Sequence, residues 1–484
     1  MAYKTVIFHR KLFRFFLLGL TVLSFIFLLL YTSNVLEVGF QLSPTPVTAG
    51  VGDTGIHEGT HALPSEYTSI PEQSPFCTRL FGTAYLKSMR DWAAEYCAPE
   101  SSSGLTCFHT QTSGSRIDSF CLARGASFNS TRQKFTLDCQ LQAPSIPNAP
   151  VETPEYRHFT NYWYNTGPNV VFDKVLDLEN TSHLTGHPGH LGHSNFTILV
   201  NREGAANPWH SLMEIFSMTM AIDVLRMSHH PQSSRPFFTA ADIDRTQILV
   251  LDDSENGPFF DLWSLFARKP VQRLKDLKLD SPIGLQNLII PAAGGSNPLW
   301  QGDWEPHSCR DSPLLRTFSN RVLDFYGLQG QTPGGADLVV TFINRTSSRK
   351  LDHSDEYFHE VEATFPHVKF RSVDFATIPF KQQLEIVRGT DVLVGVHGAG
   401  LTHGIFLSPG SAIVEILPSG LNHKGFRNVA SLLGHSYFSS HASRTNGNDW
   451  HHEDVFLEKE KFMDLMNVAI KSMYNKGERN YDVN

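Results

Sequence analysis

Apolar runs of strand length alternate with longer amphipathic or apolar stretches of helix length from about residue 196 onward. The first alternation gives the expected strands "FTILVN", "QILVLDD" and "LQNLIIP" and the expected helices "PWHSLMEIFSMTMAIDVLRM" and "LLRTFSNRVLDFYGL". This order of elements predicts a parallel α/β sheet covered by helices. The Gly/Pro-rich segment "QGQTPGGA" ends the series and marks a domain boundary near residue 330.

A second alternation follows this boundary. Its expected strands are "DLVVTFINR", "VKFRSVDF", "DVLVGVH" and "SAIVEILP", with helices between them. Two α/β units of this size predict two Rossmann-like domains that face a cleft. The expected bounds are 77–330 for a Cys-rich region with the first α/β domain, and 331–484 for the second α/β domain with a C-terminal helix.

The N-terminus carries an uncharged apolar run at residues 15–31, preceded by a basic segment, 1–14. Positive charge before such a run predicts a single-pass type II anchor with its N-terminus in the cytosol, and a cleaved signal peptide is the alternative. The Ser/Thr/Pro/Gly-rich segment that follows predicts a stem over 32–76. Because the chain ends in "NYDVN" rather than in a KDEL-type signal, we expect a Golgi membrane protein with a lumenal catalytic part.

All six cysteines lie beyond that run, and five of them lie within 77–139. This distribution predicts disulfides formed in an oxidising compartment, although six cysteines allow about 15 pairings. Four Asn-x-Ser/Thr sequons are present, at Asn129, Asn180, Asn195 and Asn344. The net charge is −8, so the chain has no excess of positive charge, and a nucleic acid is not the expected partner.

The segment "LVGVHGAGLTHGIFLSPGSAIVEILP", 393–418, is the most informative part of the chain. A buried strand leads through Gly398, Ala399 and Gly400 into a helix that contains Thr402. Glycines let the backbone approach a ligand, and a helix N-terminus offers free N–H groups to a phosphate. The spacing is not GxGxxG, so the pattern predicts a pyrophosphate site of another kind.

Two other strand ends support this interpretation. Glu415 lies near the end of "SAIVEILP", where its carboxylate could accept hydrogen bonds from ribose hydroxyls. Arg345 and Arg349 follow the strand "VTFIN" and bring two guanidinium groups to the same sheet edge. Together these groups predict a nucleoside diphosphate site.

The stretches "VTFINRTSSR", "PFKQQLEIVRGTDVLVGVHGAGLTHGIFLSPGSAIVEILP" and, more weakly, "NREGAANPWHSLMEIF" resemble glycosyltransferase family 61. The resemblance implies the glycosyltransferase B fold and an inverting transfer from a UDP-sugar, with GlcNAc or xylose as the sugar. It implies a glycoprotein or glycan acceptor and no required metal or other cofactor. The implied donor-binding residues are Arg345, Arg349, His397, Gly398, Ala399, Gly400, Thr402 and Glu415.

An inverting transfer to a hydroxyl needs a base on the acceptor side of the cleft. Asn207 is a suitable N-cap and Pro208 a suitable first residue of the long helix, so His210 and Glu214 are expected four residues apart on one face. The related sequences show a similar Asn-x-x-His-x-x-x-acid pattern. We therefore expect Glu214 to take the proton or to orient His210, while a purely structural pair is the alternative.

Other interpretations remain open at this point. Asp252, Asp253 and Glu255 could form the acidic metal site of an A-fold transferase. The histidines of "HLTGHPGHLGH" could bind a metal, but a His/Gly/Pro loop is the favoured interpretation, since the sequence offers no second group of ligands. A non-catalytic, glycosyltransferase-like partner protein is the alternative from a different class.

Overall fold

The structure, a computed structural model, describes residues 62–68, 73–144, 146, 149–163, 166–180, 195–229, 235–277, 286–331, 337–445, 449–475 and 480–482. All of them belong to one compact unit, residues 58–484. The predicted tail 1–14, the predicted anchor 15–31, most of the predicted stem and the histidine loop at 183–193 lie outside the described residues.

The predicted type II membrane anchor and Golgi location are not supported, and we withdraw them. Within the part of the chain that the structure describes, no helix combines the length and the apolar character needed to cross a bilayer.

The first sheet is mixed. Its strands are β1 (Ala93–Glu95), β2 (Gly104–Thr110), β3 (Asp118–Asn129), β4 (Lys134–Asp138), β5 (Leu176–Glu179), β6 (Asn195–Val200), β7 (Thr246–Val250), β8 (Gln272–Arg273) and β9 (Gln286–Ile290). The order is β1-β2-β3-β9-β6-β7-β8, and β4 pairs with β3 and β5. The strands β9, β6, β7 and β8 are parallel, as the alternation predicts, whereas β3 joins β9 in antiparallel fashion.

The Cys-rich region, whose fold the sequence left open, forms the antiparallel extension β1-β2-β3 of this sheet. All six cysteines form disulfides, which confirms that prediction: Cys77–Cys309, Cys97–Cys139 and Cys107–Cys121. Cys107 and Cys121 are directly opposite each other on β2 and β3. The Cys77–Cys309 bond spans 232 residues and ties the start of the region to the segment before α7 (Pro313–Phe325).

Further helices cover the first sheet. They are α2 (Pro75–Phe81), α3 (Ala84–Asp91), α4 (Pro168–Val175), α5 (Pro208–Met227) and α6 (Pro298–Gln301), with 3-10 turns η1 (Ala240–Arg245), η2 (Phe260–Phe266), η3 (Leu274–Asp276) and η4 (Gly294–Ser296). The helix α5 begins as predicted, because Asn207 Oδ1 accepts hydrogen bonds from the backbone N–H groups of Trp209 (3.0 Å) and His210 (3.4 Å). Almost every residue of α5 is buried, so this helix packs on all sides.

The second sheet is parallel throughout, with the order β11-β10-β12-β13-β14-β17. Its strands are β10 (Leu338–Ile343), β11 (Val368–Val373), β12 (Val392–Val396), β13 (Ala412–Leu417), β14 (Ser436–His441) and β17 (Asn480–Asp482), and a small pair is formed by β15 (Arg444–Thr445) and β16 (Val455–Phe456). Its helices are α8 (Ser354–Thr364), α9 (Phe380–Arg388), α10 (Gly425–Leu433) and α11 (Lys459–Asn475), with 3-10 helices η5 (Phe375–Thr377) and η6 (Ala399–Phe406). The fold is thus mixed α/β with two sheets.

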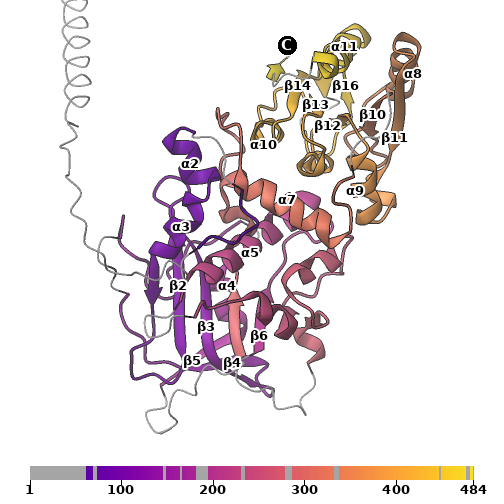
Figure 1. The fold of residues 1–484 in the computed structure, drawn as a ribbon. Helices are drawn as coiled ribbons and strands as arrows, with labels where there is room; N and C mark the ends of the chain where they lie inside the picture. Colours follow the sequence, from indigo (N-terminus) through magenta and orange to yellow (C-terminus); the bar gives the residue numbers. More distant parts are fainter. Residues whose placement is uncertain are drawn as a thin grey trace, which may run out of the picture. The chain divides into compact units, whose positions relative to one another are not determined.

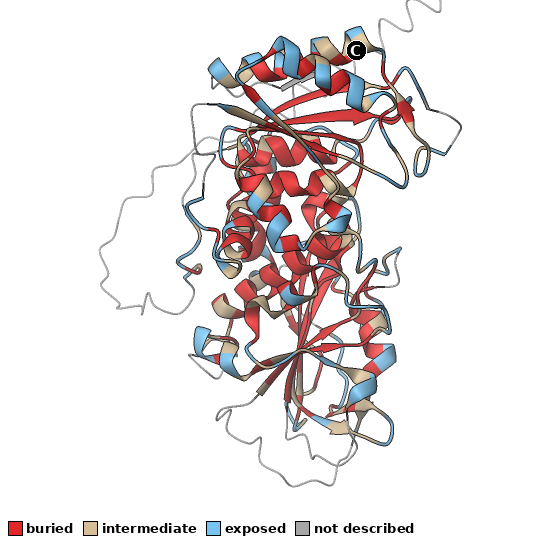
Figure 2. Cartoon of the chain, turned by 90° about the vertical axis from the view of Figure 1, so that its right-hand side faces the viewer, coloured by how far each residue is buried: buried red, intermediate tan, exposed pale blue. Residues whose placement is uncertain are grey.

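The helices α5 and α7 lie between the two sheets (Figure 1). They share one core with η6 and α10 of the second half, including Phe216, Phe318, Ile405 and Val429. Figure 2 shows these inner helices buried, whereas the helices at the outside alternate between buried and exposed positions. The two halves are therefore packed on each other through apolar side chains.

Polar contacts reinforce this packing at α10. Its Asn428 side chain donates to the carbonyl oxygens of Gly302 (3.1 Å) and Glu305 (2.9 Å), and Ser431 Oγ donates to Cys309 O (2.6 Å). Residues 302–309 belong to the first half by sequence. The helix α10 therefore bonds to a segment that the Cys77–Cys309 disulfide also holds.

Candidate functional site

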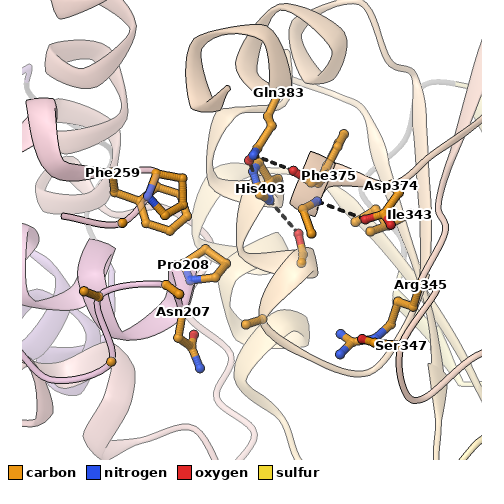
Figure 3. A pocket seen from close by; sticks show the side chains of 18 of the residues that line it. Asn207, Pro208, Phe259, Ile343, Arg345, Ser347, Asp374, Phe375, Gln383 and His403 are labelled. Atoms are coloured by element: carbon orange, nitrogen blue, oxygen red, sulfur yellow. Dashed lines mark hydrogen bonds between the residues drawn. The ribbon is translucent and has the colours of Figure 1, made fainter. Parts of the chain in front are cut away.

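A cavity of about 690 Å³ opens where the two halves meet. Its first wall comes from residues 204–208 and 254–259, and its second wall comes from the ends of β10 and β11 and the start of η6. Figure 3 shows Asn207, Pro208 and Phe259 on one side, with Arg345, Phe375 and His403 on the other. The volume suits a ligand of nucleotide size.

Two predicted residues, Arg345 and Arg349, line this cavity together. Arg345 Nε donates to Ser348 O (2.8 Å), and Arg349 Nη1 donates to His397 O (3.1 Å). Among the described residues, neither guanidinium forms an ion pair with a carboxylate, although the charge of Asp374, which also lines the cavity, acts on Arg345. Burial lowers the pKa of both groups, and the charge of Arg345 further lowers the pKa of Arg349, to about 10. Two adjacent, partly desolvated cations that form no direct ion pair make a site suited to an anion.

Gly398 lets these two guanidinium groups approach the backbone. A Cβ atom at this position would lie 2.9 Å from Nη1 of Arg345 and 2.9 Å from Nη1 of Arg349. The φ angle of Gly398 is +152°, which side-chain-bearing residues rarely adopt. We refer to Arg345, Arg349 and Gly398 as the arginine cradle.

The predicted helix after the strand is a 3-10 helix, η6, which begins at Ala399. Ala399 and Gly400 line the cavity beside the arginine cradle. A Cβ atom at Gly400 would lie 3.1 Å from Ile343 Cγ2, so the glycine allows η6 to pack against β10. Thr402 is fully buried and does not line the cavity.

His403 is a cavity residue that the sequence reasoning did not select. Its Nδ1 bonds to Gly400 O (2.7 Å), and its Nε2 bonds to Gln383 Oε1 (2.6 Å). Gln383 Nε2 in turn donates to Phe375 O (2.7 Å) and Ile378 O (2.9 Å). This network, part of which Figure 3 shows, fixes the start of η6 relative to the loop after β11. The repeated histidine of "HGAGLTH" was the sequence signal that could have identified it.

Glu415, predicted to bind ribose, is placed differently. It is fully buried and does not line the cavity. Its Oε1 bonds to His397 Nδ1 (2.5 Å), and its Oε2 accepts a hydrogen bond from Tyr437 OH (2.6 Å). Both oxygens are thus engaged inside the protein, and the carboxylate of Glu415 orients the His397 ring.

The predicted pair of His210 and Glu214 is also rearranged. Glu214 Oε1 accepts a hydrogen bond from the backbone N–H of Glu203 (3.2 Å), and Oε2 has no hydrogen-bond partner among the described residues. Burial, and then the charge of Glu203, raise the pKa of Glu214 well above its usual value. Burial therefore favours the protonated carboxyl of Glu214, and its role as the base stays a prediction.

Glu203, which the sequence reasoning did not select, is the carboxylate beside His210. Its Oε1 lies 3.6 Å from His210 Nδ1, and its Oε2 accepts a hydrogen bond from Thr166 Oγ1 (3.1 Å). Burial raises the pKa of Glu203 to about 7 and lowers the pKa of His210 to about 4. A carboxylate that titrates near neutrality beside a neutral imidazole suits proton transfer. The adjacent residues Gly204 to Pro208 line the cavity.

The acids considered for a metal site have different roles. Asp252 is engaged by Arg202, with Nη2 to Oδ1 at 2.8 Å, while Glu255 lines the cavity. Nowhere in the described ranges do three or more His, Cys, Asp or Glu side chains gather as metal ligands would.

Part of this chain is similar to known proteins. The sequence model of Glycosyltransferase 61 matches residues 209–414. The chain is 27% identical over 228 residues to an EGF domain-specific O-linked N-acetylglucosamine transferase of Drosophila melanogaster, covering 46% of this chain and 40% of the relative. The mouse protein of the same name is 30% identical over 170 residues, covering 34% of this chain and 32% of the relative. The Xenopus laevis protein is 34% identical over 134 residues, 27% of this chain and 25% of the relative. These alignments span less than half the length of each relative.

Proposed function

We propose that the protein is an inverting glycosyltransferase of the B fold that uses a UDP-sugar, because the sequence model of Glycosyltransferase 61 matches residues 209–414. The recognition of the family from the sequence is confirmed by this match. The two parallel-strand regions, packed with a cavity between them, agree with the proposed fold.

The observation that carries the proposal is the arginine cradle. Two guanidinium groups without carboxylate partners lie at the end of β10 and the start of η6, beside a cavity of nucleotide size. A diphosphate would supply the missing negative charge and accept several charge-assisted hydrogen bonds. The cradle also provides the positive charge that a departing UDP needs, so we propose that no metal ion is required.

The chemistry then divides between the two walls of the cavity. The acceptor oxygen attacks the anomeric carbon, and the bond between this carbon and the β-phosphate oxygen breaks as the new glycosidic bond forms. The acceptor proton passes to Glu203, directly or through His210, because this carboxylate is ionised above about pH 7. The negative charge moves onto UDP, where Arg345 and Arg349 stabilise it.

The proposed sugar is GlcNAc, since the relatives are named O-linked N-acetylglucosamine transferases, and xylose is the second choice. The proposed acceptor is a hydroxyl group of a glycoprotein or glycan. Three disulfides are typical of proteins that fold in an oxidising compartment, where such acceptors occur.

The test is UDP binding by isothermal titration calorimetry with the purified protein. Arg345→Ala and Arg349→Ala should each weaken binding by about 10- to 100-fold, which corresponds to losing one charge-assisted hydrogen bond. Arg444→Ala removes an arginine that stacks on Phe456 outside the cavity and should leave UDP affinity unchanged. EDTA should have no effect on binding. Unchanged affinity in both cradle variants, or loss of binding in EDTA, would contradict the proposal.

A further inference from the structure

The order of strands in the second sheet suggests how a bound UDP-sugar lies along the sheet edge. The cavity follows the ends of β11 and β10 and reaches the start of η6, which follows β12. The arginine cradle lies between β10 and η6, and Arg349 touches the carbonyl oxygen of His397 at the end of β12. If the nucleoside occupies the cavity and the diphosphate occupies the cradle, the sugar continues along the sheet edge toward the end of β13.

Two acid–histidine pairs lie in that direction, outside the cavity. His397 Nδ1 bonds to Glu415 at 2.5 Å, and His423 Nε2 lies 3.2 Å from Asp303 Oδ2. The two imidazole rings pack edge to face, with centroids 4.8 Å apart. Asp303 belongs to the first half of the chain and His423 to the second, so this group of residues is completed only by both halves. Each carboxylate fixes the orientation of its imidazole.

Two tryptophan rings flank these pairs. Trp304 lies 5.0 Å from the His423 ring, and Trp450 lies 5.7 Å from the His397 ring. Trp304 is 55% exposed, which is unusual for so large an apolar side chain. Oriented polar groups beside aromatic faces match a pyranose ring, which has hydroxyls at its rim and an apolar face of C–H groups.

We propose that His397, His423, Asp303, Trp304 and Trp450 form the subsite for the transferred sugar, a pyranosyl group still attached to UDP. The proposal rests on the proposed function. A series of aromatic ring contacts also links this subsite to the base. The distances between ring centroids are 5.5 Å from His397 to Phe426, 5.8 Å from Phe426 to Trp209, 6.1 Å from Trp209 to Trp300 and 4.8 Å from Trp300 to His210. The anomeric carbon would then lie between the arginine cradle and the pair of His210 and Glu203.

The experiment compares UDP with UDP-GlcNAc, UDP-xylose and UDP-glucose by calorimetry without any acceptor. Trp304→Ala and His423→Ala should weaken the best-bound UDP-sugar by about tenfold or more, while the affinity for UDP changes less than about twofold. Trp304→Phe keeps an aromatic face and should restore most of the affinity. Trp163→Ala, which removes another exposed tryptophan, 97% exposed, is the matched control and should change neither affinity.

The outcomes separate the two hypotheses. Equal weakening of UDP and UDP-sugar, or no change in either, would overturn the sugar subsite while leaving the proposed function intact. Unchanged donor binding with a raised KM for the acceptor would assign these residues to the acceptor and would also overturn the subsite. Failure of the wild-type protein to bind UDP would overturn both. Circular dichroism of each variant confirms that it is folded.

Discussion

Replacing Gly398 with alanine tests the arginine cradle without removing either charge. The new Cβ atom would lie 2.9 Å from each Nη1 atom and 3.0 Å from Arg349 Cζ, closer than ordinary van der Waals contact. Both guanidinium groups must shift, which misaligns the hydrogen bond from Arg349 to His397 O. The φ angle of +152° adds backbone strain of about 1–3 kcal/mol.

We expect Gly398→Ala to weaken UDP binding by about 100-fold or more, because two charge-assisted hydrogen bonds to the diphosphate, together worth about 3–6 kcal/mol, are misaligned. Gly420→Ala is the matched control. Gly420 also has a positive φ, +80°, but an added Cβ atom would have no neighbour within 4 Å. Both variants should lower the melting temperature, and only Gly398→Ala should weaken UDP binding, as measured by calorimetry. Equal UDP affinity in the two variants would refute the assignment of the cradle.

Four further variants test other parts of the structure. Burial raises the pKa of Glu203 to about 7, so if Glu203 is the base, kcat/KM should rise with pH up to about 7, and Glu203→Gln should remove this rise and lower kcat by about 100-fold. If kcat/KM of the variant still rises with pH, the base is another group. Glu214→Gln should lower kcat far less, since burial already favours the protonated carboxyl of Glu214. A loss equal to that of Glu203→Gln in the same assay would refute this. Removing the disulfide with the double variant Cys77→Ser and Cys309→Ser should lower the free energy of unfolding, measured by urea titration, by about 2–5 kcal/mol. An unchanged free energy of unfolding would show that this disulfide does not stabilise the fold. Asp223→Ala removes the buried carboxylate that pairs with Arg321 and should lower the free energy of unfolding by about 3–5 kcal/mol in the same titrations. A decrease below about 1 kcal/mol would contradict a buried ion pair.

The periodic parts of the fold could be predicted from the sequence. The four expected strands of the second half correspond to β10, β11, β12 and β13, because strands buried between helices are continuous apolar runs. The cap of α5 was also predictable, since Asn207 and Pro208 act locally. The antiparallel extension β1-β2-β3 was not, because its short strands pair through contacts and disulfides that periodicity does not encode.

Part of the candidate site could also be predicted from the sequence. Arg345, Arg349 and Gly398 come together because adjacent parallel strands end at one sheet edge. The carboxylate beside His210 was missed, since Glu203 reaches it from the loop before α5. The four-residue spacing identifies neighbours on a helix face, but on a helix buried on all sides it does not show which face meets the cavity. The role of Glu415 depended on Tyr437 in the neighbouring strand, which no local pattern reveals.

The seating of α10 has a consequence for protein engineering. This helix follows β13 in the chain, yet its Asn428 and Ser431 bond to residues 302–309, and Lys424 N bonds to Asp303 O (2.7 Å). A chimera joined near residue 330 would therefore place α10 against a foreign segment. Exchanging donor halves between related enzymes should instead transplant residues 302–312 together with 331–484, so that both sides of this contact come from one parent.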